Sequence, residues 1–214
     1  MTRNLSAVLF ALLTATTSRG DMSKVVEAYQ SVLADGGVDR STVARGAFSD
    51  MVSQAVADAP EAEFAAAVPV VRQCLRSKSP EIRRQGLVLL VVYNSRPDSA
   101  QLIEPFIDDL IAILNDPAPG MKGNAASVLG GARPTPSDKS VLALAGHLND
   151  KDNGPEEFRV VARALLSARP ADVSIVRAVL AGLSGYSSDG LDGQVIQSFG
   201  LLRITCDEAP PSPQ

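Results

Sequence analysis

The 214-residue chain contains no tryptophan, and aromatic residues make up only 4% of it. Surfaces that bind single-stranded nucleic acid usually stack bases on aromatic side chains, so the sequence lacks the usual material for such a surface. The formal net charge of −4 and the pI near 5.0 also disfavour a dedicated polyanion binder. We therefore do not expect nucleic acid as the partner.

Cysteine and histidine are scarce as well. Cys74 and Cys206 lie far apart and form no C-x-x-C motif, which argues against zinc-ribbon and thioredoxin-like chemistry. We expect Cys74 to pack on the apolar face of a helix and Cys206 to be a free thiol, rather than a disulfide between them. The single histidine, His147, cannot build a metal site or a catalytic triad alone, and a place near a helix C-terminus suits it better.

The usual catalytic and nucleotide-binding motifs are also missing. The chain has no G-x-S-x-G, G-x-x-x-x-G-K-[ST], G-x-G-x-x-G or H-E-x-x-H motif. The acidic loop 149–154 does not have EF-hand spacing, because Pro155 stands where that loop needs glycine. The sequence therefore predicts no catalytic, cofactor-binding or metal-binding residues, and no enzymatic activity.

What the chain does contain is helical periodicity. Two apolar patterns, Phe106–Leu114 and Met121–Leu129, flank a short break rich in proline, glycine and short polar residues. Such a helix pair cannot bury its apolar faces alone, so it needs copies stacked on either side.

The copies are found by an apolar–small–apolar pattern on one face of the second helix of each pair. The anchor positions are 43, 82, 121, 158 and 195, with steps of 39, 39, 37 and 37 residues. The members are Met121, Ala125 and Val128; Ile82, Gly86 and Leu89; Phe158, Ala162 and Leu165; and, more weakly, Val43, Ala47 and Met51, and Val195, Phe199 and Leu202. A near-constant period in this range indicates an array of helical pairs.

Leu114-Asn-Asp-Pro, followed by Met121-Lys-x-x-Ala-Ala-x-Val-Leu, resembles a HEAT repeat, in which leucine and aspartate precede Val-Arg-x-x-Ala-Ala-x-Ala-Leu. Arg83 and Arg159 occupy the basic position of the same template, whereas Ile196 and Phe199 depart from it. The resemblance covers roughly residues 22–204 and implies an all-α fold. That fold is a right-handed α-solenoid of about five antiparallel helix pairs, of the HEAT-like or armadillo type.

Prolines, glycines and capping residues mark where the expected helices begin and end. The second helix of the third pair is expected to fray at Gly130-Gly131 and to end before Pro134. The five pairs are 22–35 with 41–58, 61–76 with 80–94, 106–114 with 121–129, 138–148 with 155–168, and 172–184 with 191–204.

The two ends differ from the array. Residues 1–20 read as a signal peptide, with Arg3 before an apolar run and small residues ahead of Asp21, although an ordinary first helix is the alternative. Export to the periplasm or the extracellular space follows from the first interpretation, and a cytoplasmic location from the second. Residues 205–214 should be a disordered tail, and no stretch of the mature chain predicts a transmembrane segment.

Basic residues follow three of the anchors, so stacked second helices would carry a basic row for an anionic partner. Alternatively, the same residues pair internally with loop carboxylates such as Asp116, Asp150 or Asp152, and the HEAT pattern favours this interpretation. The candidate partner-binding residues are Arg83, Arg84, Lys122, Arg159 and Arg163.

The sequence thus predicts a non-catalytic scaffold that binds a protein or peptide partner along the solenoid surface. Two alternatives use related repeats: a nucleic-acid-acting protein of the HEAT-like DNA glycosylase type, and a bilin lyase-like enzyme. Neither is supported by a motif in this chain.

Overall fold

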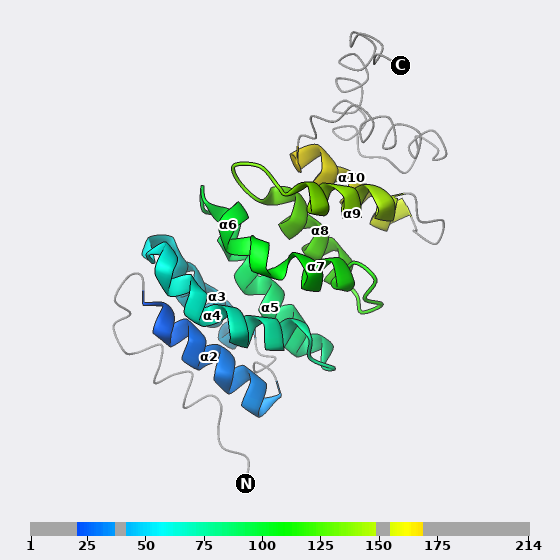
Figure 1. Ribbon diagram of the computed structural model, residues 1–214. Coiled ribbons are helices and arrows are strands. Elements are labelled where there is room, and N and C mark those ends of the chain that lie inside the picture. Colours follow the sequence, from blue (N-terminus) through cyan, green and yellow to red (C-terminus); the bar gives the residue numbers. More distant parts are fainter. Residues whose placement is uncertain (1–20, 37–41, 149–154, 169–214) are drawn as a thin grey trace, which may run out of the picture.

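The computed structural model describes residues 21–36, 42–148 and 155–168, which form helices joined by short loops (Figure 1). No strand occurs in these ranges, so the all-α prediction is confirmed. The elements are α2 (Met22–Asp35), α3 (Thr42–Asp58), α4 (Glu61–Leu75), α5 (Pro80–Tyr93), α6 (Ser99–Ile103), a 3-10 turn (Glu104–Phe106), α7 (Ile107–Ile113), α8 (Met121–Gly131), α9 (Asp138–Leu148) and α10 (Pro155–Ala168).

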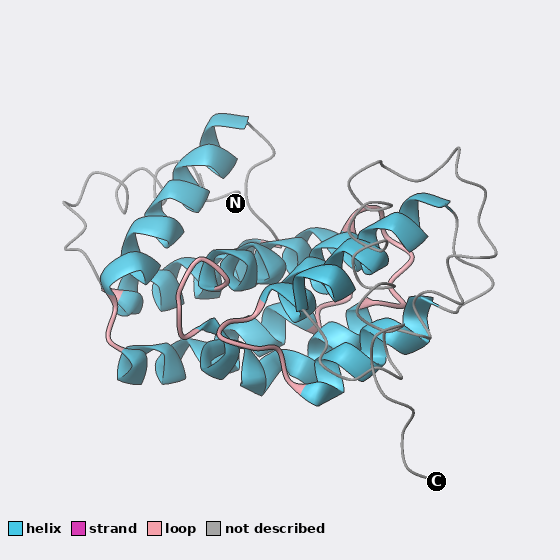
Figure 2. Cartoon of the chain, turned by 90° about the horizontal axis from the view of Figure 1, so that it is seen from above, coloured by secondary structure: helices cyan, strands magenta, loops and turns pink. Residues whose placement is uncertain are grey.

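The helices stack in sequential pairs that form two layers. Helices α2, α4, α7 and α9 contact one another in chain order, and α3, α5, α8 and α10 do the same. Figure 2 shows this stack from above. The first four predicted pairs are present, whereas the predicted fifth pair, the signal peptide (1–20) and the tail (205–214) lie outside the described residues.

The repeat register read from the sequence matches the core. Met121, Ala125 and Val128 are completely buried, as are Leu89 and Ala162 at the matching positions of neighbouring units. The small middle residue lets adjacent helices approach: a Cβ added to Gly86 would lie only 3.0 Å from Leu75 Cδ2. The apolar–small–apolar pattern therefore marks the buried face.

The bounds of the third pair agree with the prediction: α7 lies within 106–114, and α8 ends at Gly131, before Pro134. The sequence interpretation did not include α6 or the 3-10 turn containing Pro105, which precede α7. Gly130 and Gly131 are both helical, so the predicted fraying is not seen, and α8 ends at Gly131. Gly130 lies against the backbone of α10, since an added Cβ would be 2.6 Å from the Ala164 carbonyl carbon. Gly130 therefore allows close helix packing in the last turn of α8.

Arg96, in the loop between α5 and α6, ties the first two pairs together. Its guanidinium lies 5.1 Å from the centroid of the Phe64 ring and donates to the carbonyls of Val56 (3.0 Å) and Ala59 (3.1 Å) at the C-terminus of α3. It also pairs with Asp98 through two hydrogen bonds of 2.8 and 2.9 Å. One side chain thus caps a helix and covers an aromatic core residue.

Cys74 is fully buried in α4, and burial raises the pKa of its thiol to about 12. Because the thiolate is the reactive species, we expect iodoacetamide to leave Cys74 unmodified at neutral pH in the folded protein. A Cys206→Ser variant isolates this thiol. Intact mass should show one added group only after unfolding in guanidinium chloride, and labelling of the folded protein at the unfolded rate would contradict the expectation.

Candidate interaction surfaces

Arg83, the first residue of the predicted basic row, lies between the second and third pairs. Its Nε and Nη2 atoms donate to the two carboxylate oxygens of Asp116, at 2.6 and 3.0 Å. Its Nη1 atom donates to the backbone carbonyls of Ser77 (2.8 Å) and Lys78 (3.0 Å). The Arg83 and Asp116 side chains are only 16% and 7% exposed. Arg83 therefore joins its own unit to the loop of the following unit.

The pKa of Asp116 reflects its pairing with Arg83. Burial alone would raise the pKa of this carboxyl group, but hydrogen bonds from Arg83 and from the Ala118 N–H outweigh it and hold the pKa below its usual value of 3.8. Asp116 is therefore ionised at neutral pH and is a full partner for the guanidinium.

The other predicted basic residues do not form one free row. Arg84 donates to Glu81 (2.8 Å) and to the carbonyl of Pro119 (3.3 Å). Lys122 and Arg159 are partly buried and Arg163 is exposed, and each of these three has an interaction with another group. Asp150 and Asp152 lie outside the described residues. At Arg83, the structure shows the pairing with Asp116 that the HEAT pattern favoured, whereas Arg84 bonds to groups other than the predicted loop carboxylates.

A second arginine cluster, which the sequence interpretation missed, lies at the C-terminal end of α4. Asp109 of α7 accepts from Arg76 Nε through Oδ1 (2.6 Å) and from Arg72 Nε through Oδ2 (3.2 Å). Arg72 also donates to the carbonyl of Pro105. The Asp109 side chain is 8% exposed, whereas those of Arg72 and Arg76 are 39% and 62% exposed. One buried carboxylate thus holds two solvent-facing guanidinium groups.

Two depressions flank Arg76 on the edge formed by the loops within pairs. One has a volume of about 500 Å³ and the other about 380 Å³, and Arg76 lines both. The first is lined by Leu33, Pro69, Arg72, Gln73, Arg76, Ser77 and Ile82; the second by Leu75, Arg76, Arg83, Asp109, Ala112, Ile113, Asp116 and Pro117.

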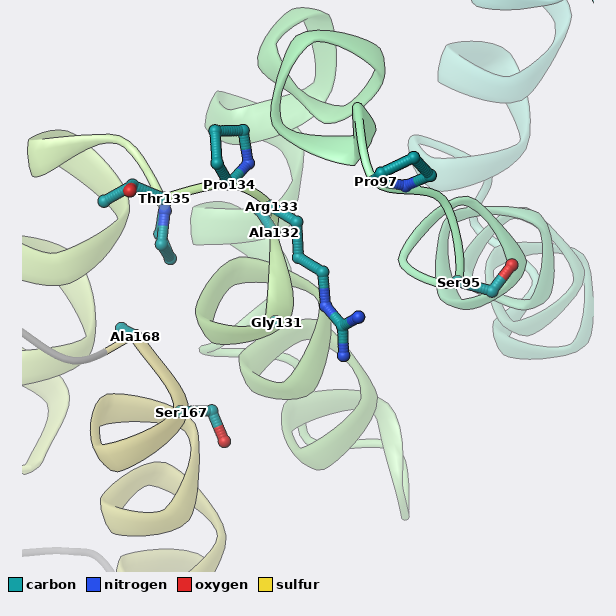
Figure 3. Close-up of a pocket in the computed structure, with 10 residues that line it drawn as sticks. Ser95, Pro97, Gly131, Ala132, Arg133, Pro134, Thr135, Ser167 and Ala168 are labelled. Atoms are coloured by element: carbon teal, nitrogen blue, oxygen red, sulfur yellow. The ribbon is translucent and has the colours of Figure 1, made fainter.

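A larger hollow of about 890 Å³ lies on the other edge, where loops connect one pair to the next. Figure 3 shows the Arg133 side chain extending into it, with Ser167 of α10 nearby. The Arg133 backbone is fixed by hydrogen bonds from its N–H to Ser99 Oγ (2.8 Å) and from the Ala100 N–H to its carbonyl (2.7 Å). The Arg133–Pro134 peptide bond is cis.

The described ranges show neither a metal-ion cluster nor a membrane-spanning helix. Residues 21–36, 42–148 and 155–168 contain no group of three or more histidine, cysteine or acidic side chains placed to hold a metal ion. In the same ranges, no helix has the length and apolar character needed to cross a membrane. His147 lies in the last turn of α9, as predicted, and is buried.

Comparison with solved structures identifies the architecture. The chain resembles a designed armadillo repeat protein, YIII(Dq.V1)4CPAF, in complex with the peptide (KR)4, with a TM-score of 0.56 and 13% sequence identity. The match covers 93% of this chain and 98% of the designed one. The chain has an armadillo-repeat-like α-solenoid fold. An engineered protein matches similarly, with a TM-score of 0.54, 13% identity and coverage of 94% and 100%.

This armadillo-like fold confirms the predicted class of helical repeat. No family model matches the sequence, and no curated protein matches it. At 13% identity the structural likeness shows the fold alone.

Proposed function

We propose that this armadillo-like protein is a non-catalytic interaction module that holds an extended segment of a protein partner on its surface. The observation that carries the proposal is the pair of depressions that follow one loop edge across the second and third units. The designed armadillo protein of similar structure binds the peptide (KR)4, which supports peptide binding as a use of such an array.

The stacking of units explains why an extended segment suits this surface. Each helix pair contacts mainly its neighbours, so the array presents repeated positions along a line instead of one enclosed cavity. An extended peptide can place successive side chains in successive depressions, and each contact adds to the affinity. On binding, the entropic cost of ordering falls mainly on the partner, because ion pairs such as Arg83–Asp116 already fix the array.

Site-specific photo-crosslinking tests this function. A photoreactive residue placed at exposed Gln73, beside the first depression, should crosslink a protein partner in the native source, and mass spectrometry should identify it. The same residue at exposed Asp50 on α3 is the control position. Failure to crosslink any protein at Gln73 above the Asp50 background would contradict the proposal. A DNA mobility shift and an absorbance scan would reveal the nucleic-acid and bilin alternatives.

We also propose that the protein is exported, on the basis of the signal-peptide pattern in residues 1–20. The partner would then be a periplasmic or extracellular protein. N-terminal sequencing of the protein from its native source should give a mature chain that starts near Asp21. An intact Met1 would contradict export.

A further inference from the structure

Arg76 has an unusual arrangement of used and unused hydrogen-bond donors. Its Nε bonds to the buried Asp109, yet its side chain is 62% exposed. Within the described part of the chain, the two Nη atoms of Arg76 have no hydrogen-bond partner. Because Asp109 is held between Arg72 and Arg76, it fixes the Arg76 side chain with the terminal fork of the guanidinium facing solvent. Such a fork matches the geometry of a carboxylate.

The charge around this fork is positive, although the whole chain is acidic. Arg72, Arg76 and the exposed Lys78 contribute three positive charges near the end of α4, and among the described residues Asp109 is the one carboxylate bonded to this group. Asp116, the other carboxylate that lines the depressions, is neutralised by Arg83. An anionic group that approaches Arg76 therefore meets a local excess of positive charge.

The surroundings of Arg76 are apolar as well as basic. Leu33, Pro69 and Ile82 line the depression on one side of it. Leu75, Ala112 and Ile113 line the depression on the other side. A ligand that only carried negative charge would leave these aliphatic surfaces exposed, so the site suits a carboxylate with aliphatic neighbours.

We infer that Arg72, Arg76, Lys78 and the two flanking depressions, together called the Arg76 site, bind an acidic segment of a protein partner that also carries aliphatic side chains. A partner carboxylate accepts two hydrogen bonds from the Nη atoms of Arg76, and its aliphatic neighbours enter the depressions. The inference rests on the proposed interaction function and specifies the chemistry of the partner. The proposed acidic segment is opposite in charge to the basic peptide held by the designed armadillo protein.

A purely structural role for Arg76 is the competing explanation. A cation at the end of α4 stabilises the helix C-terminus, and Asp109 needs a positive partner. That role uses only Nε and is shared with Arg72, so it does not explain the solvent-facing fork. The two explanations differ in what Arg76→Lys does: lysine keeps the charge and can still pair with Asp109, but it has no fork.

Peptide binding to the full-length protein tests the inference. The probes are fluorescein-labelled (Glu-Glu-Leu)4 and (Lys-Lys-Leu)4, measured by fluorescence anisotropy. We expect the acidic peptide to bind about tenfold or more tightly than the basic one, and to weaken several-fold when salt is raised. Arg76→Ala should weaken acidic-peptide binding about tenfold, and Arg76→Lys nearly as much. Arg133→Ala removes an exposed arginine on the other edge and should change binding less than about twofold.

Several results would overturn the inference about the Arg76 site. These are absence of acidic-peptide binding at millimolar concentration, equal binding of the two peptides, full retention by Arg76→Ala, and loss in Arg133→Ala instead. Circular dichroism melting of each variant separates lost binding from lost folding. If a partner crosslinked at Gln73 binds Arg76→Ala as tightly as the unchanged protein, the Arg76 site is wrong and the interaction function stands.

Discussion

Replacing Gly130 with alanine should lower the free energy of unfolding by about 3 kcal/mol, because the added methyl group has no room. Gly130 lies in α8, where a Cβ would be 2.6 Å from the carbonyl carbon of Ala164 and 2.9 Å from its Cα, with the carbonyl oxygen closer still. Those atoms belong to the backbone of α10 and cannot rotate away as a side chain can. To relieve the clash, α8 and α10 must separate, and this opens the buried contact between the third and fourth units.

Gly146→Ala is the matched control for this substitution. Gly146 is also inside a helix, α9, but a Cβ there meets nothing within 4 Å. Alanine has a higher helix propensity than glycine, so we expect Gly146→Ala to stabilise the protein by about 0.5–1 kcal/mol. Urea unfolding followed by circular dichroism measures both variants. Equal effects of the two substitutions would show that the close approach of α8 and α10 does not limit stability.

Gly130 also illustrates what the sequence can and cannot specify. A glycine pair before a proline is a strong local signal for a helix end, and that signal predicts fraying at Gly130-Gly131. In the folded chain the need for glycine at position 130 comes from Ala164 in the next unit, whose backbone leaves no room for a side chain there. Local sequence predicted the helix end before Pro134 correctly, but it did not reveal the packing requirement at Gly130.

The architecture was predictable because the repeat itself carries the information. Ile82, Met121 and Ala162 were placed on the buried face by spacing alone, and all three are buried in the structure. The contacts that define the candidate site follow no such period. Asp109 contacts two arginines located 33 and 37 residues earlier, in the preceding unit. The arginines at positions 72 and 76, one helical turn apart near a helix end, were the available signal.

The bond between Arg83 and Asp116 can be used to distinguish internal pairing from a surface role for the basic row. Arg83→Ala leaves the Asp116 carboxylate nearly buried without its main cation, and it removes the donor to the Ser77 and Lys78 carbonyls. We expect the free energy of unfolding at neutral pH to fall by about 2–3 kcal/mol, since the pair is largely buried. Arg84→Ala, which breaks a more exposed pair with Glu81, should cost no more than about 0.5 kcal/mol.

The effect of Arg83→Ala should also depend on pH. The pKa of Asp116 is lowered in the folded protein, so the stabilisation from this ionised group is complete above its usual value of 3.8 and is lost as the pH falls through the lower, folded value. Without Arg83, burial favours the protonated acid, which carries no unpaired charge. The stability difference between the two proteins should therefore be smaller at about pH 3 than at neutral pH. A difference that stays constant with pH would assign the loss to contacts other than the ionised carboxylate, and loss of partner binding with unchanged stability would instead indicate a basic binding row.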